Sequence, residues 1–236
     1  MSGSLPIAET FVSIQGEGKL TGVPSWFCRV SGCNLRCSWC DTPYASWSPE
    51  KETRLVSGLV QEAIESGVKH AVLTGGEPMM FAELVELSRG LAGAGMHITV
   101  ETAGTLVLPE LVCDLMSLSP KLANSTPADD PRDPGGAWAE RHEQRRLDFD
   151  SINELIASTR DRQLKFVVSS PGDLEEIETV LTRVEGFASS DVMLMPEGVT
   201  VPSAEDVGWV VDACVARGWS YCPRVHVQLF GDTRGT

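Results

Sequence analysis

Short apolar runs alternate with amphipathic stretches along most of the chain. Six runs rich in branched or aromatic residues predict strands, and five stretches with helical spacing between them predict helices. The predicted strands are residues 26–30, 71–74, 98–101, 115–119, 164–168 and 192–195, and the predicted helices are residues 59–66, 81–94, 152–160, 173–184 and 204–217. This alternation is typical of a parallel sheet with crossover helices.

The rhythm of these elements and the length of the chain limit the architecture. A closed barrel of eight strand–helix units usually needs about 250 residues, whereas this chain has 236. We therefore expect an α/β fold, a partial, open, TIM-like barrel of about six parallel strands, with ligands at the carboxyl ends of the strands. We expect a single domain over residues 1–236, with a surface excursion at 127–148, where Pro, Asp and Gly crowd together before a charged stretch.

Charge and the positions of the cysteines argue against several classes of protein. A net charge of -14 argues against nucleic-acid binding, because nucleic-acid binders concentrate lysine and arginine on one face. The first residues contain no secretory signal, and no stretch approaches about 18 consecutive apolar residues, so we expect a cytoplasmic protein without a membrane partner. Seven cysteines, odd in number and gathered near the N-terminus, favour metal or catalytic use in a reducing compartment over disulfides.

Three of the cysteines follow the first predicted strand with the spacing C-x3-C-x2-C, as Cys33, Cys37 and Cys40. Thiolates suit iron–sulfur clusters, and a loop of this length can place three of them around one face of a [4Fe-4S] cubane, which leaves one iron open. This is typical of radical S-adenosylmethionine (SAM) enzymes, in which the open iron binds the amino and carboxylate groups of SAM. The alternatives are a zinc knuckle completed by Cys28, or plain apolar burial. Cys28 shares a strand face with Trp26, so core packing suits it better than ligation.

From Glu9 to its C-terminus, the chain resembles the 7-carboxy-7-deazaguanine synthases of the radical SAM superfamily. The motifs that carry the resemblance are residues 13–18 (SIQGEG), 27–33 (FCRVSGC), 40–42 (CDT), 75–78 (GGEP), 119–121 (SPK) and 229–235 (LFGDTRG). The resemblance implies a ring-contracting lyase that converts 6-carboxy-5,6,7,8-tetrahydropterin to 7-carboxy-7-deazaguanine with loss of ammonia, in queuosine-type 7-deazapurine biosynthesis. It also implies Mg2+, a homodimer, and a low-potential electron donor such as a flavodoxin or a ferredoxin.

The resemblance assigns SAM binding to residues of the cysteine loop and to residues that close successive strands. Glu77 is suited to accept a hydrogen bond from the methionine ammonium of SAM, and Trp39 is expected to lie against the adenine. Without the resemblance, the 75–78 motif would also suit a turn before a helix. The usual superfamily run is Glu-Thr-Asn-Gly, so Ala103 removes a polar contact. The expected SAM contacts are Trp39, Gly76, Glu77, Glu101, Ser119, Pro120 and Lys121.

The same resemblance assigns the pterin substrate to the start of the chain. Gln15 and Glu17 suit the donor and acceptor edge of a pterin, although the 14–17 run also fits a β-turn. Arg29 alternates with Cys28 along the strand, so it should face the barrel interior, where a substrate carboxylate would pair with it. The expected substrate contacts are Ile14, Gln15, Gly16, Glu17, Arg29 and Thr74.

Asp41 and Thr42 directly follow the last cysteine, where hard oxygen ligands suit Mg2+. We expect the Thr42 hydroxyl to bind the ion and Asp41 to hold the surrounding shell, although the pair alone also suits a turn. Two other functions stay open, namely a radical SAM activating enzyme that acts on a glycyl-radical partner protein, and a zinc-binding interaction module. The 13–18 motif and the tail argue against the first, and a brown colour with absorbance near ~400 nm would exclude the second.

Overall fold

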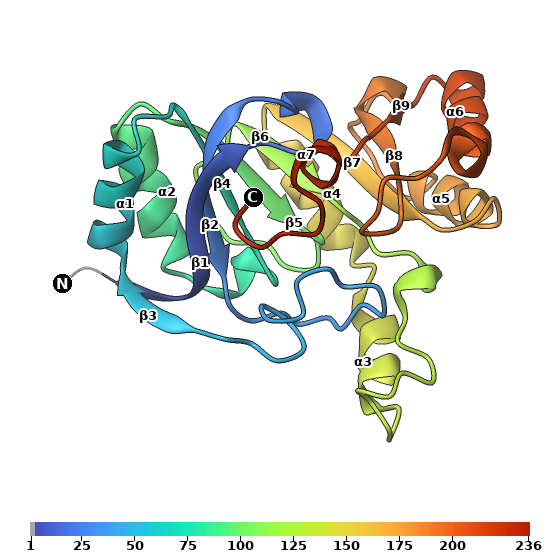
Figure 1. Ribbon diagram of the computed structural model, residues 1–236, viewed down its shortest axis with the longest axis horizontal. Coiled ribbons are helices and arrows are strands. Elements are labelled where there is room, and N and C mark those ends of the chain that lie inside the picture. The colour runs from blue at the N-terminus through green and yellow to red at the C-terminus, as the bar shows by residue number, and fades with distance from the viewer. Residues whose placement is uncertain (1–2) are drawn as a thin grey trace.

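The computed structural model describes residues 3–236, and its strands form one nine-stranded sheet (Figure 1). The sheet order is β3-β1-β2-β4-β5-β6-β7-β8-β9, and within the described chain its two edge strands do not pair with each other, so the sheet stays open. β1 is antiparallel to both of its neighbours, and the strands from β2 to β9 in this order are parallel. The strands are β1 (Ser4–Ile14), β2 (Pro24–Val30), β3 (Glu52–Leu55), β4 (His70–Gly75), β5 (His97–Thr102), β6 (Leu115–Leu118), β7 (Asp161–Val168), β8 (Val192–Pro196) and β9 (Ser220–Tyr221).

Helices connect most of the parallel strands. The α-helices are α1 (Val56–Glu65), α2 (Leu84–Gly93), α3 (Ala137–Arg145), α4 (Phe149–Ser158), α5 (Asp173–Leu181), α6 (Ala204–Arg217) and α7 (Val225–Phe230). Short 3-10 turns are η1 (Gly18–Leu20), η2 (Pro78–Met80), η3 (Ala123–Ser125) and η4 (Ser189–Asp191). No helix within residues 3–236 is both long enough and apolar enough to cross a membrane.

The six predicted strands correspond to β2 and β4 to β8, and the five predicted helices correspond to α1, α2 and α4 to α6. The prediction missed β1, β3, β9, α3 and α7. Two of these lack the expected hydrophobic pattern: α3 buries only His142, and β1 buries only Leu5 and Ile7 among its eleven residues. β9 has two residues, too few for any period. Their positions depend on neighbours in the fold and not on their own periodicity.

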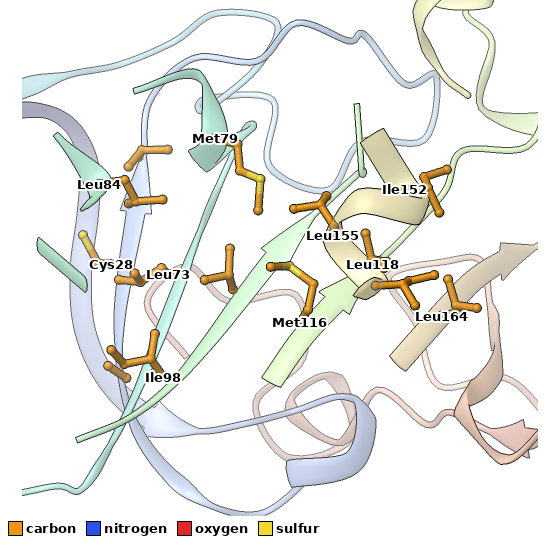
Figure 2. Close-up of a cluster of buried hydrophobic side chains, with 14 of the residues drawn as sticks. Cys28, Leu73, Met79, Leu84, Ile98, Met116, Leu118, Ile152, Leu155 and Leu164 are labelled. Carbon is orange, nitrogen blue, oxygen red and sulfur yellow. The ribbon is translucent and has the colours of Figure 1, made fainter. Parts of the chain in front are cut away.

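Alternation along the parallel strands separates the core from the opposite face of the sheet. Cys28 on β2, Leu73 on β4 and Ile98 on β5 point into the core beside residues from the helices, as Figure 2 shows. The residues between them in sequence, such as Arg29 and Thr74, line a cavity on the other face. Alternate residues of these strands therefore face away from the core, on the side of the sheet where a ligand can contact them.

Candidate active site

A cavity of about 680 Å³ lies on the sheet face opposite the core. Its size falls within the range of small-molecule sites, about 300 to 1,000 Å³. The carboxyl ends of the parallel strands and the loops that follow them contribute most of its wall, as expected for this architecture. All of the sequence-predicted site residues except Glu77 and Pro120 line this one cavity.

The loop that follows β2 carries the three predicted cluster ligands. Cys33, Cys37 and Cys40 line the cavity, whereas Cys28 is fully buried in the core on the other face of β2. Burial raises the pKa of the Cys28 thiol and of the Cys33 thiol to about 12 alike. Position, and not the pKa of the thiol, therefore separates Cys33 from the core cysteine Cys28.

The donors on this wall fit a cluster better than a single metal ion. Within residues 3–236, no three His, Cys, Asp or Glu side chains converge closely enough to hold one ion. A [4Fe-4S] cubane is held differently, because each thiolate binds a different iron and the sulfur atoms need not converge. Three free thiols on one curled loop therefore fit a cubane with one open iron and do not fit a zinc knuckle.

A buried histidine on α3, His142, forms a hydrogen bond with the cysteine loop, a contact that was not predicted from the sequence. The Arg36 N–H donates to His142 Nδ1 at 3.2 Å, and His142 Nε2 lies 2.8 Å from Ser125 Oγ. Because a backbone N–H only donates, Nδ1 must be unprotonated, and Nε2 donates to Ser125, which donates in turn to the Leu122 carbonyl at 2.6 Å. Burial lowers the pKa of His142 to about 4, which preserves the neutral imidazole that this chain of hydrogen bonds needs.

We expect His142→Phe to loosen the cysteine loop and to speed the loss of iron. His70 is the matched control, because it is also buried, lies 2.7 Å and 2.8 Å from the hydroxyls of Ser25 and Thr99, and contacts no part of the loop. Each Phe variant should lower the free energy of unfolding by about 1–3 kcal/mol, since buried partners lose a hydrogen bond. Only His142→Phe should release iron faster to a chelator. Equal release rates in the two variants would show that α3 has no specific hold on the loop.

The motif at 75–78 packs against the cysteine loop. A Cβ on Gly76 would lie 2.1 Å from the Gly32 carbonyl oxygen, so any other residue there would push the two segments apart. The Gly76 and Glu77 N–H groups donate to the carbonyls of Val30 and Gly32 at 3.2 and 2.9 Å. The motif thus holds the start of the cysteine loop in place, in addition to contributing Gly76 to the cavity wall.

Glu77 and Pro120 are the two predicted SAM contacts that lie outside the cavity lining, and both are buried. The Glu77 carboxylate accepts hydrogen bonds from Met79 N at 3.1 Å, Thr102 Oγ1 at 2.8 Å and Ala103 N at 2.9 Å. Burial raises the pKa of Glu77, and these donors oppose that shift. Glu77 therefore supports the turn after β5, formed by Thr102 and Ala103. These two residues line the cavity, whereas Glu77 does not.

A buried network of charges joins the 14–17 run to the sheet. Lys165 on β7 lies 2.5 Å from Glu17 and 3.2 Å from Glu101, and it is only 5% exposed. Arg224 also pairs with Glu17, at 3.2 Å, and Gln15 Nε2 donates to Glu101 at 3.1 Å. The structure therefore brings together Gln15, Glu17 and Glu101, which the sequence analysis predicted from separate motifs.

Lys165 and Arg224 are the functional candidates that the sequence analysis missed. Burial alone would raise the pKa of Glu17, but Lys165 and Arg224 lower it to about 2. Burial would lower the pKa of Lys165, but Glu101 and Glu17 raise it above its ordinary value. A signal for Lys165 was present, because it lies in a predicted strand and alternates with core residues, as Arg29 does.

Arg29 lines the cavity, as its alternation with Cys28 predicts, but an anion of the protein already lies beside it. Its Nε donates to Glu9 Oε1 at 2.7 Å, and Glu9 also accepts from Tyr44 at 2.8 Å and from Arg234 at 3.1 Å. Burial would raise the pKa of Glu9, but the hydrogen bonds from Arg29 and Tyr44 lower it. No hydrogen bond joins the terminal nitrogens of Arg29 to residues 3–236, so a ligand carboxylate would meet those atoms.

Asp41 and Thr42 line the cavity between the cysteines and the charged network. Thr42 Oγ1 lies 3.8 Å from Cys40 Sγ. The Asp41 carboxylate forms an ion pair with Arg224, which also holds Glu17. Through its ion pair with Arg224, Asp41 thus connects the cysteine loop to Glu17 in the 14–17 run.

The side chains of Trp39, Ser119 and Lys121 form another part of the wall. Lys121 Nζ donates to Ser119 Oγ at 2.8 Å and lies 5.6 Å from the centroid of the Trp39 ring. Trp39 Nε1 donates to Asn124 Oδ1 at 3.3 Å, so a hydrogen bond anchors the indole. This arrangement leaves an aromatic surface beside polar groups, a combination that suits a nucleoside.

The C-terminal tail packs onto the 14–17 run (Figure 1). Val225 N, at the start of α7, donates to the Gly16 carbonyl at 2.9 Å, and a Cβ on Gly16 would lie 2.0 Å from His226 Nδ1. Only glycine leaves room for this contact. Near the end of the chain, Arg234 pairs with Glu9 and with Glu50, which holds the tail beside Arg29.

Comparisons with known proteins agree with this geometry. The family model described as the radical SAM superfamily matches residues 28–176. The chain is similar to the 7-carboxy-7-deazaguanine synthases of Rhodopirellula baltica, with 49% identity over 99% of this chain and 89% of that protein, and of Halobacterium salinarum, with 44% identity over 99% and 93%. Its fold is similar to the crystal structure of QueE from Escherichia coli, with a TM-score of 0.70 and 24% identity over 94% of this chain and 95% of that one.

Proposed function

Because the chain belongs to the 7-carboxy-7-deazaguanine synthases, within the radical SAM superfamily, we propose that the cavity of about 680 Å³ holds a cluster, SAM and a pterin together. The enzyme is a radical SAM lyase of 7-deazapurine biosynthesis, which converts 6-carboxy-5,6,7,8-tetrahydropterin to 7-carboxy-7-deazaguanine with loss of ammonia. Its cofactors are a [4Fe-4S] cluster and SAM. When bound, these supply the radical that removes a hydrogen atom from the substrate.

The chain's own residues divide the cavity between the ligands. Cys33, Cys37 and Cys40 would hold the cluster, and Trp39, Gly76, Glu101, Ser119 and Lys121 would hold SAM. Glu77 and Pro120 support this wall from behind, in place of the direct SAM contacts that the resemblance implied. These assignments are supported by the shared cavity and by the hydrogen bonds that fix each side chain.

The pterin occupies the opposite end, against Ile14, Gln15, Gly16, Glu17, Arg29 and Thr74. The terminal nitrogens of Arg29 take the substrate carboxylate, and Glu9 keeps the guanidinium in position through Nε. Lys165 and Arg224 keep Glu17 ionised, so that it accepts a hydrogen bond from the amino edge of the ring. The C-terminal tail covers this end of the cavity.

The observation that carries the proposal is that the cysteine loop and the 14–17 run line one continuous cavity. The test is anaerobic reconstitution with iron and sulfide, then reaction with SAM, dithionite and the carboxytetrahydropterin, followed by mass spectrometry. We expect 5'-deoxyadenosine, 7-carboxy-7-deazaguanine and ammonia together. SAM cleavage without the deazaguanine would retain the radical chemistry and reject the substrate, and a colourless protein would reject both.

We propose that the Thr42 hydroxyl would hold Mg2+, with Asp41 beside it and paired with Arg224, and that the ion would supply positive charge near the substrate. Thr42→Val should lower product formation and remove most of its dependence on Mg2+, because the hydroxyl ligand is lost while the cysteines are kept. Thr53→Val is the control, since Thr53 is exposed on β3 and outside the cavity lining. The measurement is steady-state product formation with and without Mg2+. An unchanged Mg2+ response in Thr42→Val would place the ion elsewhere.

The proposal also covers the domain organisation, the oligomeric state, the cellular compartment and the electron donor. We take residues 1–236 as one radical SAM domain that forms a homodimer in the cytoplasm and receives electrons from a low-potential donor such as a flavodoxin or a ferredoxin. One continuous sheet supports the single domain, and seven free cysteines suit a reducing compartment. Val211 and Val215, one turn apart on α6 and 43% and 79% exposed, offer an apolar face for a second copy.

A further inference from the structure

Two arginines lie over one tryptophan beside the cysteine loop, and a third follows on the same helix. Arg36, in that loop, lies 4.1 Å from the Trp138 ring centroid, and Arg141 on α3 lies 5.3 Å from it. Arg145 follows one turn after Arg141 on the same helix. Arg141 and Arg145 are exposed, and Trp138 and Arg36 are half-buried. We call these four residues the α3 patch; α3 projects away from the rest of the molecule in Figure 1.

The α3 patch carries positive charge that the protein itself does not neutralise. Within residues 3–236 its three arginines form no ion pair with a carboxylate, unlike Arg132 and Arg146 nearby, which pair with Asp130 and with Glu143 and Glu176. This contrasts with a net charge of -14 for the whole chain. An unpaired group of cations on an acidic protein steers acidic partners to one place.

The α3 patch touches the backbone of the cysteine loop directly. Arg36 Nη1 donates to the carbonyls of Cys33 and Leu35, both at 2.7 Å, and Arg145 Nη1 donates to the Asn34 carbonyl at 3.3 Å. The hydrogen bond from Arg36 N to His142 Nδ1 ties α3 to the same loop. A partner bound here would therefore lie one side chain away from the cluster ligands, at a fixed position.

An open cavity of about 750 Å³ adjoins the α3 patch. Asn34 and Arg145 belong to its wall, together with apolar groups from Met79, Met80 and Leu106. Asp148 and Asp150 also line it, where α4 begins. The wall of this cavity is thus mixed in polarity and charge, so the unpaired arginines of the α3 patch, and not the cavity, select an acidic partner.

We propose that the α3 patch is the docking surface for an acidic protein that carries a low-potential one-electron group. The inference rests on the proposed function, because only a radical SAM enzyme needs an electron delivered to this loop. With a flavodoxin as the carrier, its anionic flavin hydroquinone loses one electron and becomes the neutral semiquinone. The cluster gains that electron and passes from its 2+ to its 1+ state, and no covalent bond forms or breaks.

The test compares two reductants on the reconstituted holoenzyme. The probes are a reduced flavodoxin, which must dock, and dithionite, which is small and needs no docking surface. The variant Arg141→Glu reverses one charge of the α3 patch and keeps the hydrogen bonds of Arg36 and Arg145 to the cysteine loop. The matched control is Arg160→Glu, which makes the same charge change at an exposed position before β7, at the opposite end of that strand from the cysteine loop.

We expect the α3 variant to need at least about tenfold more flavodoxin for half-maximal cluster reduction at low ionic strength, with a smaller effect in high salt. Its reduction by dithionite and its dithionite-driven product formation should match those of wild type and of the control. If flavodoxin reduces the α3 variant and the control equally well, the docking proposal is wrong while the proposed function stands. If dithionite reduces no cluster in the wild type, both fail. Loss of RNA binding in the α3 variant, with flavodoxin reduction unchanged, would reassign the patch to nucleic acid.

Discussion

Serine in place of Cys33, Cys37 or Cys40 is expected to abolish iron binding and all SAM cleavage, whereas serine in place of Cys28 should leave the iron content nearly normal. The three loop thiols line the cavity and are the only protein ligands proposed for the cluster. A serine hydroxyl is a harder and more weakly acidic ligand than a thiol, so one exchange removes a third of the cluster's protein ligands. We expect SAM cleavage to fall below detection.

Cys28→Ser is the internal control because the change of chemistry is the same and only the position differs. Cys28 is fully buried among apolar side chains, so a hydroxyl there should lower the free energy of unfolding by about 1–3 kcal/mol. Cys28→Ala separates this cost from any effect on iron. The measurements are iron per protein, absorbance near ~400 nm and the yield of 5'-deoxyadenosine. A folded Cys28→Ser protein that loses as much iron as the loop variants would contradict the assignment.

Lys165→Met should cause the second largest loss, in both stability and product formation. The variant leaves Glu17 and Glu101 buried without the cation that lies between them. Removing one partner of a buried ion pair costs about 3–5 kcal/mol, and a similar loss in transition-state binding would lower product formation by more than about 100-fold. Urea unfolding of the variant and its product formation with dithionite are the measurements.

Lys19→Met is the matched control, because Lys19 also joins two carboxylates, Asp161 and Asp191, but its side chain is 26% exposed against 6% for Lys165. The control should lose less than about 1 kcal/mol. Adding Glu17→Gln to Lys165→Met should recover part of the lost stability, since one unpaired charge is removed. Equal losses of unfolding free energy in the two lysine variants, or no recovery in the double variant, would show that the buried ion pairs of Lys165 contribute no more to stability than the partly exposed pairs of Lys19.

The pH dependence of stability should follow from the same network. The pKa of Glu17 is lowered from 4.5 to about 2, so its contribution is present above pH 4.5 and is lost as the pH falls toward 2. The pKa of Lys165 is raised from 10.5, so its contribution is present below that pH and is lost only at higher pH. The stability difference between wild type and Lys165→Met should therefore be largest between these limits.

Much of the fold was predictable because its central strands are buried on both faces. The runs at 71–74, 164–168 and 192–195 are continuously apolar apart from single positions such as Thr74 and Lys165, and the structure confirms each as a parallel strand. Among the missed elements, β3 and β9 are the edge strands of the sheet, and β1 and α3 bury few apolar residues. α3 is the clearest case, because its buried residue is a histidine that serves another loop.

The residues of the site likewise divide into those predicted from local motifs and those whose contacts only the structure reveals. Motifs with local spacing, such as the three cysteines and the 14–17 run, were predicted and line one cavity. Glu77 was assigned to SAM because its motif follows a strand end, but its side chain turns into the protein and meets the Thr102–Ala103 turn instead. Arg29 was expected to pair with a substrate carboxylate, and the structure adds Glu9 beside it on the neighbouring strand β1, which the prediction did not include.

By itself the sequence determined the class of fold, the cysteine loop and the faces to which Cys28 and Arg29 belong, because these depend on spacing within short segments and on the period of a strand. The tertiary structure alone decided which charges meet. Glu17 is 148 residues from Lys165 and 207 residues from Arg224 along the chain, and no local sequence pattern predicts such pairs. They meet because antiparallel β1 ends beside the start of β2, the segment after it packs against β7 through the Lys19 N–H and Gln163, and Val225 N at the start of α7 donates to the Gly16 carbonyl. Burial then makes each charge depend on partners that only the folded chain supplies.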